Sequence, residues 1–157
     1  MAALSAPATL GLAGCVSSEA SQVDHGALVL ALLGMVIPDT ATPGAANPAN
    51  CAFVLRAVDA GLMGAPSNTL DLLAADLDSR AGGSFLSLPP SRRTVILADL
   101  DQAVFAKVSA HAAPWLTTKA LILMSYYTSE VGASRELRYE LVPGRFDSDV
   151  IEIGRAS

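Results

Sequence analysis

The chain has 157 residues, of which 52% are hydrophobic and only 16% are charged, and its formal net charge is −5. This length fits one domain with its own core and is too short for a two-domain oxidoreductase. The negative charge argues against nucleic-acid binding, which needs a basic surface. The excess of apolar over charged residues indicates that a partner covers part of the apolar surface.

Residues 1–23 form the first segment, which is an N-terminal arm or the remnant of an export signal. Residues 1–15 are small, apolar and uncharged, and they end in Leu-Ala-Gly-Cys, which is similar to a lipobox. The basic residues that begin an export signal are missing from this stretch. Either its basic part lies upstream, or the segment is an ordinary flexible or docked arm.

Residues 24–129 form the second segment, and their pattern predicts a compact all-α bundle of about five helices. The first helix, residues 27–37, is apolar on every face, as expected of a central helix. Ser21 and Asp24 have the form of a capping box before it, and Pro38 stops it. No apolar run reaches the roughly 18 residues that a membrane-spanning helix requires.

The later helices are marked by their starts and by their apolar spacing. Capping asparagines or prolines of the first turn stand at Asn47-Pro48, Asn68, Pro89-Pro90 and Pro114. Each helix then carries one apolar stripe at helical spacing, the pattern typical of a face packed on a core. These stripes are Val54, Leu55, Val58 and Leu62; Leu70, Leu73, Ala74 and Leu77; Ile96, Leu97, Leu100, Val104 and Val108; and Leu116, Ala120, Leu123 and Tyr127.

The third segment, residues 130–157, is expected to be an irregular, extended tail that packs on a partner. All three tyrosines fall within residues 125–147, together with several arginines and glutamates. Tyrosine and arginine dominate the centres of protein interfaces. The expected interface residues are Tyr126, Tyr127, Arg135, Glu136, Arg138, Tyr139, Pro143, Arg145 and Phe146. The alternative is that the tail packs back on its own bundle, with its Arg–Glu pairs at the surface.

Few residues suit catalysis or cofactor binding. The two histidines, His25 and His111, have no metal-binding spacing, and there is no Cys-x-x-Cys for haem or an iron–sulfur cluster. No glycine fingerprint for a dinucleotide follows a strand, and no nucleophile elbow marks a serine. We therefore expect no catalytic, cofactor-binding or metal-binding residue in this chain. The acid pairs Asp76/Asp78 and Asp99/Asp101 are interpreted as solvated helix faces, since residues two apart do not face each other.

The two cysteines leave three alternatives open. A lipidated Cys15 would tether the chain to a membrane and leave Cys51 as a lone thiol, buried as a small hydrophobic side chain. A Cys15–Cys51 disulfide would join the N-terminal arm to the second helix in an oxidising compartment. Both thiols can also be free. The disulfide is favoured here, because the sequence retains residues 1–14.

Two stretches carry a resemblance to a known family. The longer reads Tyr-Tyr-Thr-Ser-Glu-Val-Gly at residues 126–132, Glu-Leu-Arg-Tyr at 136–139 and Val-Pro-Gly-Arg-Phe-Asp at 142–147. The shorter reads Ile-Pro-Asp at 37–39 and Thr-Pro-Gly-Ala at 42–45. Together they resemble the gluconate 2-dehydrogenase subunit 3 family, the small (gamma) subunits of bacterial dehydrogenase complexes.

The resemblance implies a non-catalytic small subunit of a periplasmic dehydrogenase that oxidises a sugar, sugar alcohol or glycoside. The implied partner is a large flavoprotein of the glucose–methanol–choline type that holds FAD, and an iron–sulfur cluster can accompany the flavin there. A third subunit, a cytochrome c, would carry haem c. The small subunit would help the large one to fold and would carry it through twin-arginine export.

A different class of protein is the alternative. A free-standing helical lipoprotein or small-ligand binding module of the cell envelope would need no flavoprotein, and a lipid anchor would place it at the membrane. A stand-alone hydrolase has no supporting motif. A large FAD-binding reading frame beside this one would favour the subunit.

Overall fold

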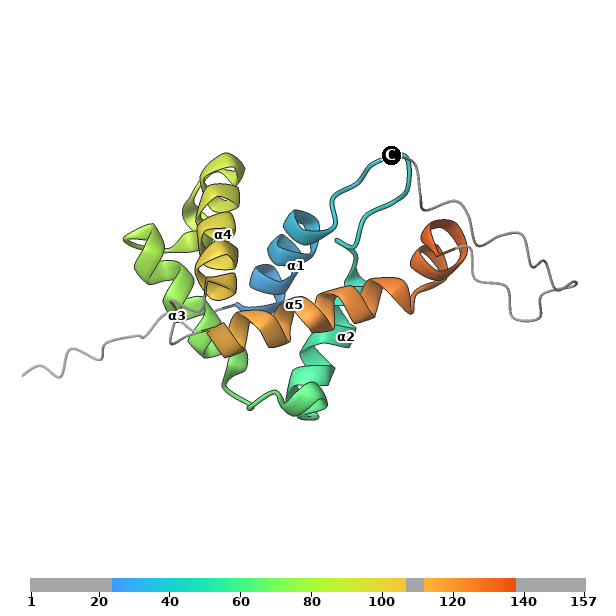
Figure 1. The fold of residues 1–157 in the computed structure, drawn as a ribbon, viewed down its shortest axis with the longest axis horizontal. Coiled ribbons are helices and arrows are strands. Elements are labelled where there is room, and N and C mark those ends of the chain that lie inside the picture. The colour runs from blue at the N-terminus through green and yellow to red at the C-terminus, as the bar shows by residue number, and fades with distance from the viewer. Residues whose placement is uncertain (1–23, 107–111, 138–157) are drawn as a thin grey trace, which may run out of the picture.

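The computed structural model describes residues 24–106 and 112–137, and within these residues the chain is helical and contains no strand. The α-helices are α1 (His25–Val36), α2 (Pro48–Asp59), α3 (Thr69–Ala81), α4 (Pro90–Phe105) and α5 (Ala112–Tyr127). Three short turns, η1 (Leu62–Gly64), η2 (Phe85–Ser87) and η3 (Gly132–Glu136), follow α2, α3 and α5. Figure 1 shows α5 running along the long axis, with α3 and α4 at one end and η3 at the other. The predicted all-α bundle is confirmed.

Local signals account for the start and end of α1. The carboxylate of Asp24 accepts a hydrogen bond from the backbone N–H of Ala27 at 3.0 Å, so Asp24 is the N-cap. The capping box predicted for Ser21 is therefore not the cap that the helix uses, and Ser21 itself lies outside the described residues. The N–H of Ile37 closes the last turn on Leu33, and Pro38 follows.

The capping prediction is confirmed at the start of α2 and is wrong at the start of α3. The side chain of Asn47 accepts from the N–H of Asn50 at 2.9 Å, and Pro48 occupies the first helical position, as predicted. Asn68 stands at the N-cap of α3, but its side chain makes no capping hydrogen bond. The hydroxyl of Thr69 instead donates to the carbonyl of Pro66, which ties the helix to the preceding turn.

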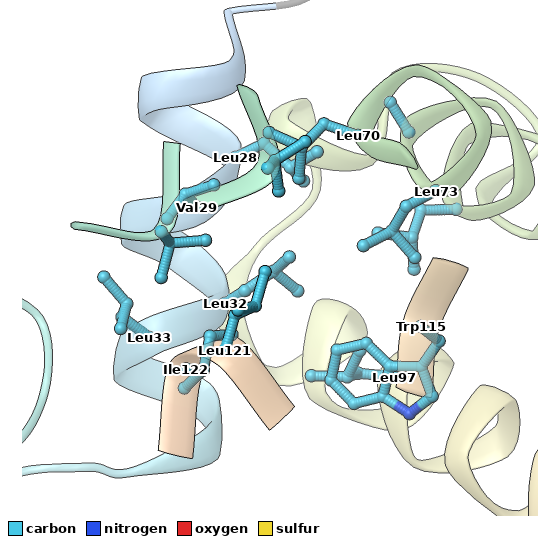
Figure 2. Packing of buried hydrophobic residues seen from close by; sticks show 14 of the residues in the cluster. Leu28, Val29, Leu32, Leu33, Leu70, Leu73, Leu97, Trp115, Leu121 and Ile122 are labelled. Atoms are coloured by element: carbon cyan, nitrogen blue, oxygen red, sulfur yellow. The ribbon is translucent and has the colours of Figure 1, made fainter. Parts of the chain in front are cut away.

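The core lies where all five α-helices meet, and α2 contributes Cys51, Val54, Ala57 and Val58 to it. Figure 2 shows leucines of α1 and α3 converging with Leu97 of α4 and with Trp115, Leu121 and Ile122 of α5. The central position predicted for α1 is confirmed for one side, where Leu28, Val29, Leu32 and Leu33 are buried, whereas Leu30 on the other side is 39% exposed. Each buried leucine or isoleucine of this kind stabilises the fold by about 2 kcal/mol relative to an exposed one.

Most of the predicted stripes face this core. Val54, Val58, Leu97, Leu100, Val104 and the four residues of α3 are buried. Leu62 is an exception: α2 ends at Asp59, and Leu62 falls in the separate η1 turn, where its side chain is exposed. Val108 lies outside the described residues. Among those residues, no helix has the length and apolarity that crossing a membrane would require.

Candidate partner interface

The loop between α1 and α2 has a fixed shape. The N–H of Gly44 donates to the carboxylate of Asp39 at 2.7 Å, and the N–H of Ala45 donates to the carbonyl of Ile37 at 3.0 Å. A Cβ at residue 44 would lie only 2.5 Å from the carbonyl oxygen of Ile37, so only glycine fits this close approach. The shorter of the two family-like stretches therefore folds back on the end of α1.

Tyr126 joins this loop to the end of α5. Its side chain is only 2% exposed, and its hydroxyl donates to the carbonyl of Pro43 at 3.0 Å, across 83 positions of sequence. Burial, followed by the nearby negative charge of Glu136, raises the pKa of Tyr126. The phenol therefore stays protonated and keeps its role as donor over the physiological pH range.

The chain turns back immediately after α5. The hydroxyl of Ser129 donates to the carbonyl of Tyr126 at 2.6 Å and accepts from the N–H of Gly132 at 3.2 Å. Gly132 is buried, and a Cβ there would overlap the carbonyl of Tyr126. Residues 132–136 then form a π-helical turn. The expectation of an extended chain from residue 130 onward is wrong for this turn, because backbone packing at Gly132 holds the chain against α5.

The predicted interface residues divide into three groups. Tyr126 is part of the core of its own bundle, so it offers no surface to a partner. Tyr127 is 40% exposed and packs edge-on against Tyr126, with ring centroids 5.3 Å apart, while Arg135 and Glu136 are exposed on η3. Arg138, Tyr139, Pro143, Arg145 and Phe146 lie outside the described residues.

The outward side of α5 is apolar, and sequence reasoning placed it incorrectly. The stripe Leu116, Ala120, Leu123 and Tyr127, which we call the α5 outer face, points away from the core: Leu116 is 44% exposed and Leu123 is 36% exposed. The core is instead contacted by the opposite side, with Trp115, Leu121, Ile122 and Tyr126. Both sides are apolar at the same period, so periodicity alone could not tell which one is buried.

A groove lies beside the first turns of α5. It has a volume of about 340 Å³ and lies between η1, the start of α3 and α5, with Pro66, Leu72, Ala113, Pro114 and Thr117 among its lining residues. No lining residue carries a charge. The groove is therefore suited to an apolar side chain, as expected of a contact with another protein.

A polar cluster fixes α4 to α5 on another side of the bundle. One carboxylate oxygen of Asp101 accepts from the indole N–H of Trp115 and from the ammonium of Lys119, each at 2.7 Å. Burial opposes ionisation of Asp101, but the two hydrogen bonds and the charge of Lys119 outweigh it and lower the pKa of the carboxyl group. Asp101 is thus a structural anion, and its interpretation as a solvated helix face is wrong.

A second hollow of about 230 Å³ adjoins this cluster, lined by Met35 and Val36 of α1 and by Thr94, Leu97 and Ala98 of α4. Lys119 lies over the rings of Phe105 and Trp115, 5.4 and 5.8 Å from their centroids. Its attraction to both rings and to Asp101 accounts for its position. No sequence motif signalled this arrangement, because its residues belong to two helices.

Cys51 is a free thiol in the core, next to the carbonyl of Gly26. Burial, with a smaller contribution from the charge of Asp24, raises the pKa of the Cys51 thiol. In the described residues Cys51 packs as a small apolar side chain at the contact between α1 and α2. Cys15 lies outside the described residues, so its predicted disulfide with Cys51 and its alternative lipidation stay predictions.

In the part of the chain that the structure describes, no three His, Cys, Asp or Glu side chains lie close enough together to hold a metal ion. The ring of His25 pairs with the carboxylate of Asp71 at 2.9 Å and links the start of α1 to α3. Asp76 and Asp78 also have structural partners: Asp76 pairs with Arg80, and Asp78 accepts from the N–H of Phe85. His111 lies outside the described residues.

A comparison with protein families matches residues 24–144 to the model described as gluconate 2-dehydrogenase subunit 3. The match covers the whole described bundle and both stretches that form the contact between Tyr126 and Pro43. Neither the search of curated proteins nor that of solved structures returned a similar protein.

Proposed function

Because the chain belongs to the gluconate 2-dehydrogenase subunit 3 family, we propose that it is the non-catalytic small subunit of an FAD-dependent dehydrogenase complex. The complex oxidises a sugar, a sugar alcohol or a glycoside. The observation that carries this proposal is the family match over residues 24–144, which spans most of the chain. The family is defined by its membership of a dehydrogenase with several subunits, so the chain acts by binding other subunits.

The surface of the bundle supports a role in binding. The α5 outer face presents Leu116, Leu123 and Tyr127 to solvent, where each apolar side chain would be stabilised by a partner. The exposed Arg135 and Glu136 of η3 adjoin the same end of α5. The chain then continues into residues 138–146. There the proposed contacts with the partner are made by Arg138, Tyr139, Pro143, Arg145 and Phe146.

In this proposal the redox groups belong to the other subunits. The large subunit is a flavoprotein of the glucose–methanol–choline type that holds FAD and, in some complexes, an iron–sulfur cluster. A cytochrome c subunit accepts the electrons through haem c. The small subunit contributes surface rather than ligands, and it stabilises the fold of the large subunit by covering apolar area.

We place the complex in the periplasm. A folded flavoprotein without a signal of its own crosses the membrane only if it is bound to a chain that has one. The apolar residues 1–15 fit the later part of such a signal. Binding in the cytoplasm would therefore precede export, and the small subunit would act as both chaperone and carrier.

Co-expression tests the proposal. The full chain with an affinity tag is produced together with the FAD-binding large subunit that the proposal requires, and the purified material is examined by absorption spectroscopy. We expect a larger co-eluting chain with a flavin spectrum, and dye-linked oxidation of a sugar or sugar alcohol. The large subunit expressed alone is the control and should give less soluble flavoprotein. A tagged chain that elutes alone and colourless would contradict the proposed function.

A further inference from the structure

The α5 outer face (Leu116, Ala120, Leu123 and Tyr127) is part of a continuous strip along one side of the helix. At 3.6 residues per turn, positions 113, 116, 117, 120, 123, 124 and 127 fall within about one third of the helix circumference. From Leu116 to Tyr127 the strip is about 16 Å long at a rise of 1.5 Å per residue. Ala113 and Thr117 belong both to this strip and to the wall of the groove between α3, η1 and α5. The strip and the groove therefore form one surface.

This surface differs from the outer sides of α2, α3 and α4 in its lack of charge. The outer sides of α2, α3 and α4 carry exposed charged side chains at Arg56, Asp59, Asp71, Arg92 and Asp99. The whole of α5 contains a single charged residue, Lys119, and its ammonium is paired with Asp101 of α4 at 2.7 Å. An uncharged apolar strip of this length is typical of the buried centre of an interface.

We propose that the α5 outer face and the adjoining groove form the surface that binds the large dehydrogenase subunit, through an apolar and uncharged patch on that subunit. This inference rests on the proposed function. A bulky apolar side chain of the large subunit enters the groove of about 340 Å³, and the strip packs beside it. Tyr127, at the far end, joins this surface to η3 and to the tail.

The charge of the chain favours a different protein over a second copy as the occupant. Two copies each carry a net charge of −5, and their mutual repulsion disfavours self-association. A patch without charges on the large subunit meets the strip without leaving any charge buried and unpaired. Membership of a subunit family supplies the partner that this surface needs.

The experiment places a charge on the strip and compares it with an equal change elsewhere. Leu123→Glu is the test, and Val95→Glu on α4 is the matched control, since Val95 is 56% exposed but flanked by Arg92 and Asp99. Each full-length variant is co-expressed with the tagged large subunit, and the amount of small subunit recovered is measured. We expect at least a tenfold loss for Leu123→Glu and no loss for Val95→Glu, because an unpaired charge would be buried in the complex.

The outcomes separate this surface from the proposed function. If the unchanged chain is not recovered with the large subunit, both fail. If the unchanged chain and Leu123→Glu are recovered equally, the surface assignment is overturned and the subunit role stands. Light scattering on the isolated chain must show a monomer. A dimer that Leu123→Glu dissociates would mean that a second copy covers the strip, and would also overturn the assignment.

Stability of the isolated chain tests whether its own residues cover the strip. We expect Leu123→Glu to leave the melting temperature within about 2 °C, since an exposed side chain contributes little to folding. If the melting temperature of Leu123→Glu falls by more than about 5 °C, the melting temperature of a second variant, Leu116→Gln, shows whether the strip is covered by the chain itself. An equal fall there would mean that the chain covers its own strip and would overturn the proposal, whereas lost binding at unchanged stability would support it.

Discussion

The two sides of α5 are similarly apolar, but one is buried in the core and the other is exposed to solvent. The inner side contributes Trp115, Leu121, Ile122 and Tyr126 to the core, whereas the outer side leaves Leu116, Leu123 and Tyr127 exposed. Two long-range hydrogen bonds distinguish them: the indole N–H of Trp115 reaches Asp101, and the hydroxyl of Tyr126 reaches Pro43. Both donors lie on the inner side, one near each end of the helix. They fix its rotation about its axis.

The comparison shows that hydrophobicity alone does not define a core face. Burying either side of α5 would remove a similar apolar area from water, so the hydrophobic effect hardly discriminates between the two rotations. A buried indole or phenol group, however, needs a hydrogen-bond partner. Only the inner side has such partners, and this leaves the outer side to another protein.

The largest loss of stability should come from removing the side chain of Tyr126, which is buried on the inner side at the end of α5. Tyr126→Ala deletes a buried ring and leaves the carbonyl of Pro43 without its donor, and we expect it to lower the free energy of unfolding by about 3–5 kcal/mol. Tyr127→Ala, one position away on the outer side, should cost less than about 1 kcal/mol. Chemical denaturation of both variants measures the contrast. Equal losses would mean that the two sides are not distinct.

A smaller loss is expected where the chain turns back against α5. Gly132→Ala introduces a Cβ into the carbonyl of Tyr126 and should cost about 1–3 kcal/mol through displacement of η3. Gly34→Ala is the control, because its Cβ would lie 3.4 Å from the nearest atom, the Cβ of Ala46. We expect the control to be neutral or slightly stabilising, since alanine is the better helix former. Thermal melts that rank the two variants in the opposite order would contradict the observed turn.

The stabilisation that Asp101 provides at the start of α5, through its hydrogen bonds from Trp115 and Lys119, should depend on pH. Asp101→Asn weakens two hydrogen bonds to a charged acceptor and should cost about 1–2 kcal/mol at neutral pH. Because the folded pKa of Asp101 is lowered, its stabilisation is present above the usual carboxyl range and is lost as the pH falls through the lowered value. The difference between the unfolding free energies of the two proteins should therefore shrink in acid. A difference independent of pH would rule out this role.

The smallest effect concerns the contact between α1 and α2. The thiol of Cys51 is buried and its pKa is raised, so in a Cys15→Ser variant the native chain should react with a thiol reagent at least tenfold more slowly than the unfolded chain. Absorbance of the released reagent at neutral pH measures the rate. Fast labelling of the native chain would mean that this contact opens readily.

The sequence predicted the features that depend on neighbouring residues. Asn47-Pro48, Pro90 and Gly82 mark helix ends through local backbone chemistry, and the structure places α2, α3 and α4 accordingly. What could not be predicted depends on distant pairs. The bonds from Tyr126 to Pro43 and from Lys119 to Asp101 join separate elements, and no spacing rule connects such residues.

The candidate interface shows the same limit. Tyr126 was expected to contact a partner because tyrosine is common in interfaces, but an aromatic ring with a hydroxyl group is equally suited to a core that supplies an acceptor. Leu123 was grouped with core residues because its period is helical, although the opposite side of α5 has the same period. In both positions the deciding contact comes from another part of the chain, which the residue type does not reveal.

The most direct test of the central claim is the accessibility of position 123 in the free chain and in the complex. A Leu123→Cys thiol is introduced into a chain that also carries Cys15→Ser and retains the buried Cys51, and it is labelled before and after assembly with the large subunit; Val95→Cys in the same background serves as the reference. We expect both thiols to react rapidly in the free chain, and only the thiol at position 123 to become at least tenfold slower in the complex. An unchanged rate at position 123 in the assembled complex would show that the outer side of α5 is not the binding surface.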